Sequence, residues 1–252
     1  MTSTTRVVLG VVVVIVLFVS LLAVAILRVG TTGGPAYALE AAPRAASTPA
    51  PRPVDQGASR SEGRQIVDPA WVARMSGLAG IPAPALRAYA AAELIVRAEQ
   101  PECHLGWNTL AGIGWIESQH GTIGGRTMLA DGRSSRPILG PALDGSGNYA
   151  AIRSSPASTA WHGDPEWDHA VGPLQFLTST WDRWGADGDG DRSADPRDLD
   201  DAALAAGRYL CADDHDLATD SGWNAAVHSY NHDTGYVADV AAAANAYVER
   251  AR

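Results

Sequence analysis

The chain begins with an apolar segment long enough to cross a membrane. Val7 to Leu27 covers 21 residues interrupted only by Gly10 and Ser20, and as a helix it would rise about 31 Å. That length matches the roughly 30 Å hydrocarbon core of a bilayer. The small-x-small pattern Ala36-Tyr37-Ala38 is typical of a signal-peptide cleavage site. We therefore expect residues 1–28 to be an uncleaved transmembrane signal anchor, with secretion after cleavage following Ala38 as the alternative.

The segment that follows lacks the side chains to build a core. Residues 29–65 contain eight alanines, five prolines and almost no bulky apolar residue, so we expect a disordered linker. The remaining 187 residues, 66–252, are enough for a single globular domain. The predicted arrangement is a single-pass protein of the cell membrane that holds this domain on the outer side.

Charge and composition exclude several classes of function. All 19 basic residues are arginines, and the chain carries a formal net charge of −9. From Ile66 onward there are 25 acidic residues against 13 arginines, a net charge of −12. A domain this acidic repels phosphate backbones, so we expect no nucleic-acid partner. A hydrophobic content of 46% excludes a disordered chain, a collagen-like repeat and a multi-span membrane protein.

The two cysteines, Cys103 and Cys211, lie 108 positions apart and belong to no CxxC pair. In a chain with an export-type N-terminus, the simplest interpretation is one disulfide. Closing a loop of this length would stabilise the fold by about 4–5 kcal/mol in the chain-entropy model. Two unrelated buried thiols are the alternative.

The periodicity and capping signals of the domain predict a mainly helical fold, either irregular all-α or α+β. Residues 122–170 are rich in Gly, Pro, Ser and Asp, and we expect at most short strands there, around Tyr149 to Ile152. No alternation of strands and helices and no phosphate-binding glycine loop is present. The predicted helices cover residues 68–75, 85–98, 107–119, 178–184, 201–211, 222–230 and 236–250.

Glu117 stands out as a candidate acid. It continues a stripe of otherwise apolar residues on one face of the helix predicted over 107–119. It also lies in the last turn, where the helix dipole disfavours an anion. Burial and the dipole both raise the pKa of a carboxyl group, as a general acid requires. A surface Glu on a frayed helix end, or a buried Glu bonded to a backbone amide, is the structural alternative. Gly112 and Gly114 indicate close approach of another segment or a ligand.

Three short motifs occur in a recognisable order. Glu117-Ser118-Gln119-His120-Gly121 resembles the catalytic Glu-Ser-x-x-Gly motif of lytic transglycosylases, and Gly172-Pro173-Leu174-Gln175-Phe176 resembles their Gly-x-x-Gln-aromatic element. Tyr230-Asn231 resembles their Tyr-Asn element, and 58 and 55 positions separate the three key residues. The match is to the membrane-bound lytic murein transglycosylase B group in its exported actinobacterial form, over roughly Ile81 to Tyr247.

This resemblance implies a lysozyme-like fold and activity on peptidoglycan glycan strands. It implies that Glu117 is the acid/base, that Ser118 and Gln175 hydrogen-bond the substrate or the catalytic carboxylate, and that Tyr230 and Asn231 line the cleft. No cofactor is required. Several of the eight tryptophans would suit sugar stacking, above all Trp161, Trp167 and Trp223, although core packing explains each of them individually better.

Most glycosidases need two carboxylates, whereas the resemblance supplies only Glu117. We therefore expect a single-carboxylate route: cleavage of the MurNAc–GlcNAc β-1,4 bond with assistance from the substrate's acetamido group, closing a 1,6-anhydroMurNAc end. Lysozyme-type hydrolysis of the same bond is the second interpretation. A non-catalytic glycan-binding module on the same fold is the third, and a calcium-dependent interaction module is the fourth.

An Asp-rich loop, Asp187-Gly188-Asp189-Gly190-Asp191, places acids at positions 1, 3 and 5 of an EF-hand-like loop, with Ser193 at position 7. Members of the resembling group can bind calcium here, with a last carboxylate placed as Asp201 is. The departure is Arg192 at position 6, where the sharp turn favours Gly. A structural calcium held by Asp187, Asp189, Asp191, Ser193 and Asp201 and a solvated acidic turn without metal are both open.

Overall fold

The computed structural model describes residues 41–43, 49, 66–147 and 150–252. Among these residues it has eight α-helices and no strand, which confirms the mainly helical prediction. Six isolated bridges, such as Asp144 with Ala151, take the place of the short strands that we expected. The helices are α2 (Pro69–Ala79), α3 (Ala83–Glu99), α4 (Trp107–Ser118), α5 (Pro156–His162), α6 (Thr178–Trp184), α7 (Leu199–Leu210), α8 (Asp220–Tyr230) and α9 (Thr234–Arg250).

Local signals explain where the first of these helices begins and ends. The side chain of Asp68 accepts a hydrogen bond from the Ala70 amide, and Pro69 occupies the first helical position, as the sequence indicates. The helix continues past the predicted end to Gly80, whose left-handed φ of 72° ends it without the steric cost that a side chain would add. Of the eight helices, α5 was not expected from the sequence.

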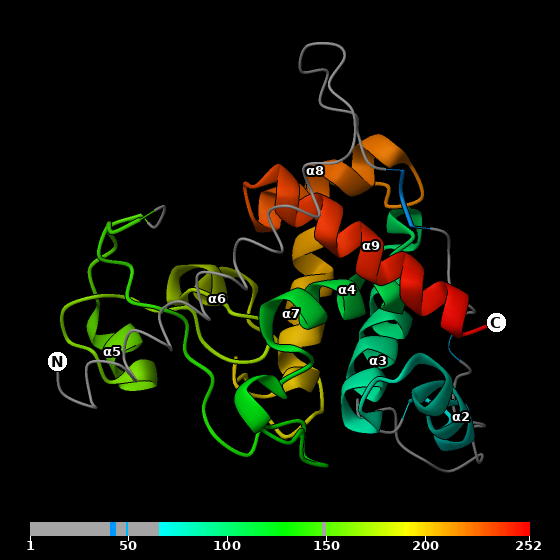
Figure 1. Cartoon of the computed structure of the whole chain (residues 1–252), viewed down its shortest axis with the longest axis horizontal. Coiled ribbons are helices and arrows are strands. Elements are labelled where there is room, and N and C mark those ends of the chain that lie inside the picture. The colour runs from blue at the N-terminus through cyan, green and yellow to red at the C-terminus, as the bar shows by residue number, and fades with distance from the viewer. Residues whose placement is uncertain (1–40, 44–48, 50–65, 148–149) are drawn as a thin grey trace, which may run out of the picture. The chain divides into compact units, whose positions relative to one another are not determined.

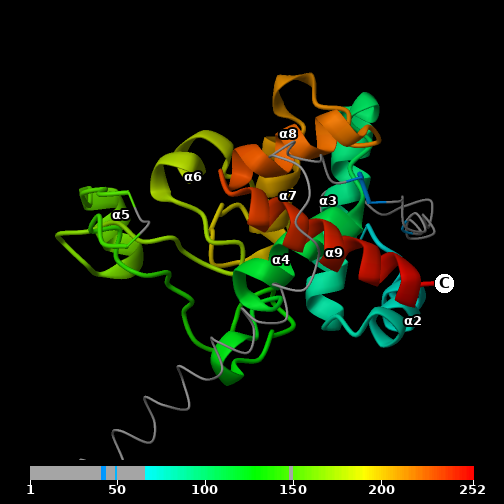
Figure 2. The same ribbon diagram turned by 45° about the horizontal axis from the view of Figure 1, so that its top comes forward.

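The four helices α3, α4, α7 and α9 form the centre of the fold. α4 packs against α9 and α3, and α3 packs against α7; Figures 1 and 2 show these helices gathered between α5 at one end and α2 at the other. A Cβ on Gly112 would lie 2.8 Å from the Val240 carbonyl oxygen of α9, and one on Gly114 would overlap the Tyr89 hydroxyl of α3. The glycines therefore serve close approach of neighbouring segments, one of the two options that the sequence left open.

Cys103 and Cys211 form a disulfide, as predicted. It ties the turn that follows α3 to the residue that ends α7, and the Leu217 amide donates a hydrogen bond of 2.8 Å to the Cys103 carbonyl. Both half-cystines belong to the buried core. The bridge therefore fixes the α3–α7 pair on which the central helix α4 rests.

The predicted anchor, residues 1–28, and most of the predicted linker, residues 29–65, lie outside the described residues. Within the part that is described, no helix combines the length and the apolar character needed to cross a bilayer. The membrane anchor stays a prediction from the sequence.

Candidate active site

The helix that carries Glu117 has a defined end. The Gln119 and His120 backbones are left-handed, with φ of 52° and 59°, and Gly121 follows with φ of 80°. The His120 amide donates to the Gly114 carbonyl at 2.8 Å, a capping bond of the kind that closes many helices. Glu117 therefore lies in the last turn of α4, as the sequence predicts.

The Glu117 side chain is partly buried and has one hydrogen-bond partner among the described residues. The Tyr236 hydroxyl donates to its Oε1 at 2.6 Å. Burial raises the pKa of Glu117 to about 7, and the hydrogen bond from Tyr236 acts in the opposite direction. A carboxyl group with this pKa is present in both protonation states near neutral pH, so it can donate a proton and later accept one.

Tyr236 is the residue of this site that sequence reasoning missed. It lies in the first turn of α9, which Asp233 caps by accepting hydrogen bonds from the Gly235 and Tyr236 amides. Burial raises the pKa of Tyr236 well above its ordinary value, and the charge of Glu117 adds to the shift. The phenol therefore stays protonated and donates to the Glu117 carboxylate. The two residues are 119 positions apart, and no local pattern links them.

Gln175 lies in a tight turn beside the site. The bridge between Val171 and Phe176 closes this turn, with amide-to-carbonyl distances of 2.9 and 3.0 Å. Gln175 itself has a left-handed φ of 52°, a conformation that costs energy for a residue with a side chain and is often found at functional sites. Its side-chain amide donates to the Gly172 carbonyl at 2.8 Å.

The position of the Gln175 side chain also explains Gly140. A Cβ at Gly140 would lie 2.8 Å from Gln175 Oε1, so a side chain there would displace the carboxamide. Two backbone bonds hold the segments together: the Gly140 amide donates to Ala170, and the Gly172 amide donates to Ile138. The segment from Ile138 to Gly140 and the turn that carries Gln175 are therefore held together by the backbone.

Tyr230 has a pKa well above its ordinary value, raised first by burial and then by the charge of Glu117. Its hydroxyl donates to the Leu174 carbonyl at 2.8 Å. The rings of Phe176 and Tyr209 pack edge-on against it. Asn231, by contrast, is exposed and follows directly after α8. The structure thus brings Glu117, Tyr230 and the Gln175 turn together, with Asn231 at the surface.

Ser118 has partners different from those that the resemblance implies. Its side chain is fully buried; its hydroxyl donates to the Pro173 carbonyl at 2.6 Å and accepts from the Gly121 amide at 2.8 Å. Neither bond leaves the hydroxyl directed at a substrate or at the Glu117 carboxylate. Ser118 instead fastens the end of α4 to the turn that carries Gln175.

Aromatic residues near the site divide into core and surface. Trp223 is 1% exposed and its indole donates to Thr109 at 3.1 Å, so it cannot stack on a sugar. Trp161 and Trp167 are partly exposed. His120 is buried, bonded to the Tyr89 and Tyr247 hydroxyls, and burial lowers its pKa to about 4. The structure thus gives His120 a structural role. Trp161 packs edge-on against Trp181, and the Arg153 guanidinium lies 3.9 Å from the centre of the Trp167 ring and covers one of its faces.

The Asp-rich loop brings three of the predicted ligands together. Carboxylate oxygens of Asp187, Asp189 and Asp201 lie within 4.8 Å of one another, and among the described residues no other acidic, His or Cys group forms such a cluster. The Gly188 and Asp195 amides donate to the two oxygens of Asp201, and burial raises its pKa to about 7. Asp191 is exposed and is not part of the cluster. Arg192, the departure from the loop pattern, has a left-handed φ of 75°.

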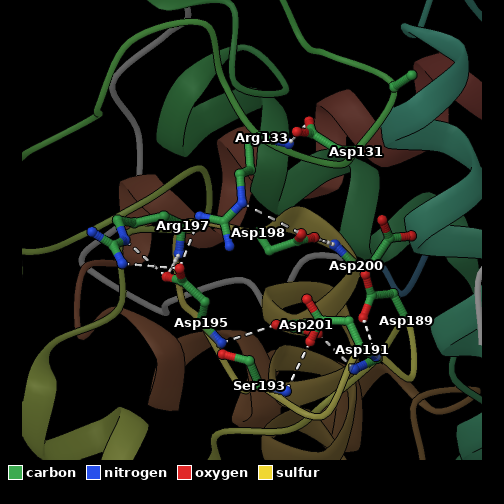
Figure 3. Close-up of polar contacts among 12 residues, drawn as sticks. Asp131, Arg133, Asp189, Asp191, Ser193, Asp195, Arg197, Asp198, Asp200 and Asp201 are labelled. Atoms are coloured by element: carbon green, nitrogen blue, oxygen red, sulfur yellow. Dashed lines mark hydrogen bonds and ion pairs between the residues drawn. The ribbon is translucent and has the colours of Figure 1, made fainter.

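Next to this loop, arginines surround a different carboxylate. Figure 3 shows Arg133 and Arg197 pointing toward Asp195, with ion pairs of 2.8 and 2.9 Å. Burial acts to raise the pKa of Asp195, but the hydrogen bonds from Arg197 and Arg133 outweigh it and bring the pKa to about 2. Asp195 is therefore a fixed anion rather than a proton donor.

Comparisons of the chain with protein-family models, with curated proteins and with solved structures find no match.

Proposed function

We propose that the chain is a peptidoglycan lytic transglycosylase with a lysozyme-like helical domain. The observation that carries the proposal is the state of Glu117: a partly buried carboxyl group at a helix end, with a pKa of about 7 and one hydroxyl donor. The three motifs that resemble the family meet around this carboxyl group. Their arrangement supports cleavage of the MurNAc–GlcNAc β-1,4 bond.

In the first step, protonated Glu117 donates its proton to the glycosidic oxygen as the bond to the MurNAc C1 breaks. The carbonyl oxygen of the MurNAc acetamido group attacks C1 and carries the positive charge that develops there. Tyr236 donates to one carboxylate oxygen and so stabilises the anion that remains after proton transfer.

In the second step, the Glu117 carboxylate accepts the proton of the MurNAc C6 hydroxyl. The C6 oxygen attacks C1, the acetamido group leaves, and a 1,6-anhydro ring forms without consumption of water. This route needs one carboxylate.

The other site residues fit supporting roles. The exposed Asn231 and the partly exposed Gln175 would contact the glycan, and Tyr230, bonded to the Leu174 carbonyl, would support the Gln175 turn. Ser118 acts through the Pro173 carbonyl as a positioning residue, because its bond joins the acid-bearing helix to the Gln175 turn. Loosening this bond would change the distance between acid and substrate.

The setting that we propose is the cell wall. The disulfide between Cys103 and Cys211 suits an oxidising, exported environment, and the N-terminal 28 residues would hold the domain at the membrane. The acidic surface, with a net charge of −12 from Ile66 onward, disfavours nucleic acid.

The proposal is tested by incubating purified sacculi with the full chain and following release of soluble glycan fragments. Release supports the enzyme. Binding of sacculi without any release, at pH values on both sides of 7, contradicts it and favours a glycan-binding module.

We also propose that the Asp187, Asp189 and Asp201 cluster holds a structural calcium ion. The donor set fits, because calcium prefers several carboxylate oxygens and three of them converge here. Calcium at 100 times its dissociation constant should stabilise the fold by about 2.7 kcal/mol, measured as a rise in the unfolding midpoint. Asp201→Asn should remove the rise, and Asp182→Asn, on exposed α6 surface, should keep it. The absence of calorimetric binding below millimolar calcium would contradict the site.

A further inference from the structure

A recess lies next to the candidate active site. It has a volume of about 190 Å³, and its walls come from the segment 133–138, the Gly172–Pro173 dipeptide and Arg197. Gly172 and Pro173 begin the turn that carries Gln175, and the Pro173 carbonyl accepts the hydrogen bond from Ser118. The recess therefore shares a wall with the machinery around Glu117.

The lining of this recess is cationic in a domain that is otherwise acidic. Arg133, Arg136 and Arg197 line it, and no acidic residue does. Arg133 and Arg197 share Asp195 as their ion-pair partner. Arg136 is exposed and donates only to the Gly124 carbonyl, at 2.9 Å. Among the described residues no carboxylate forms an ion pair with it, so its guanidinium can bind an anion from outside.

The remaining walls show which kind of anion fits. Pro137, Ile138 and Pro173 are apolar, which suits a carboxylate carried on a carbon chain better than a phosphate that is polar on all sides. Ser135 accepts a hydrogen bond from the Thr127 amide, which leaves its own hydroxyl hydrogen available to donate to an anion. Arginine forks bind carboxylates with two parallel hydrogen bonds.

The size of the recess shows how much of a ligand it encloses. Its 190 Å³ is below the roughly 300–1,000 Å³ of sites that surround a whole small molecule. It therefore fits one side arm of a larger ligand, whose main body lies in the neighbouring site. An extended peptide reaches about 3.3–3.6 Å per residue, so a stem of four residues spans roughly 13–14 Å from the sugar.

We propose that this recess binds a carboxylate of the peptide stem on the glycan strand, with Arg136 as its main contact. The inference depends on the proposed function, because it takes the glycan bound at Glu117 as the body of the ligand. The recess would make the enzyme prefer strands that still carry their peptides.

The test compares cleavage of glycan strands that carry peptide stems with strands from which an amidase has removed them. The full wild-type chain should show a kcat/KM about tenfold higher for the peptide-bearing strands, in the range expected of a charge-assisted contact. Arg136→Gln should bring this ratio close to one. Arg74→Gln removes an exposed arginine from α2, outside the recess, and should leave the ratio unchanged. Equal cleavage of both strands by the wild type would overturn the inference and leave the proposed function intact.

A direct titration separates this result from failure of the enzyme. The free tetrapeptide stem should bind the full chain by calorimetry, and Arg136→Gln should weaken binding about tenfold. Arg136→Lys, which keeps the charge and loses the fork, should fall between the two. If neither kind of strand is cleaved, the proposed function fails, and the titration alone then shows whether the recess binds the peptide stem. No binding of the peptide, or tighter binding of an oligomeric glycerol phosphate, would overturn the inference.

Discussion

A glutamate side chain lies at each end of α4: Glu93, which belongs to α3, at the start and Glu117 in the last turn. Burial raises the pKa of each to about 7. At the first end, Glu93 accepts a hydrogen bond of 2.7 Å from the Trp107 amide and pairs with Arg97. At the last end, Glu117 has the Tyr236 hydroxyl as its partner. A raised pKa therefore occurs at both places, so the pKa alone does not distinguish the two groups, whereas their partners differ.

The helix itself acts differently on the two groups. Its N-terminus presents unpaired amides that favour a carboxylate, so Glu93 caps α4; its C-terminus disfavours an anion. Glu93 is 6% exposed and its oxygens are occupied by main-chain and arginine donors. Glu117 is more exposed and adjoins Tyr230 and the Gln175 turn. Only Glu117 can therefore pass its proton to a bound ligand, which makes it the candidate catalyst of the two.

The largest expected difference is in turnover. Glu117→Gln should lower the rate by about 10²–10⁴-fold or more, since in the proposed mechanism one group performs both proton transfers and the amide can perform neither. Glu93→Gln should leave the rate close to that of the wild type, because Gln keeps an oxygen for the Trp107 amide. Release of fragments from sacculi measures both, and circular dichroism checks that each variant is folded. Substantial activity in Glu117→Gln would show that the assignment is wrong.

The next difference is in stability as a function of pH. A carboxyl group whose pKa is raised on folding adds stability that is complete below the unfolded pKa of about 4.5 and is lost as the pH rises through about 7. Glu117→Gln removes this loss, so the variant should be more stable than the wild type by about 1–2 kcal/mol at pH 8, after allowance for solvent screening. At pH 4 the two should be nearly equal.

Glu93→Gln should gain less at pH 8, because the α4 N-terminus and Arg97 favour the carboxylate that the substitution removes. Chemical denaturation at the two pH values compares the variants. An equal gain at both positions would mean that burial alone governs the two glutamates.

The smallest effect concerns Tyr236. Its hydrogen bond lowers the Glu117 pKa, so Tyr236→Phe should raise that pKa further. Because the first step needs protonated Glu117, the activity falls as the pH rises through this pKa, and the variant should keep activity to higher pH. The turnover number should drop several-fold through loss of one hydrogen bond to the carboxylate. A pH–rate profile with an unmoved basic limb would show that Tyr236 does not bond Glu117 during catalysis.

Much of the fold could be predicted from periodicity and caps. The signals around Pro69, Thr178 and Tyr236 lie within about one turn of the observed helix starts. α5 was missed because its capping box is formed by Ser155 and Ser158 in place of the usual Glu or Gln at the third position. It also lies in a stretch whose Gly, Pro and Asp content indicates loops.

The site was predictable where its residues lie in motifs and not where they meet across the fold. Glu117 and Gln175 could be named from local sequence. Ser118 could be named too, but its bond to Pro173 depends on packing 55 positions away. Tyr236 bonds Glu117 across 119 positions, and Arg136 lines a recess together with Pro173 and Arg197; no spacing rule connects these residues. Tertiary contacts decide such roles, and a single sequence does not encode them in any short pattern.

The mass of the released fragments tests the central claim most directly. If Glu117 alone performs both proton transfers and no water enters, each product should end in a 1,6-anhydro sugar and weigh one water less than a lysozyme product of the same length. Mass spectrometry of fragments released by the full chain measures this difference. Products that carry the additional water would contradict the transglycosylase mechanism and establish hydrolysis in its place.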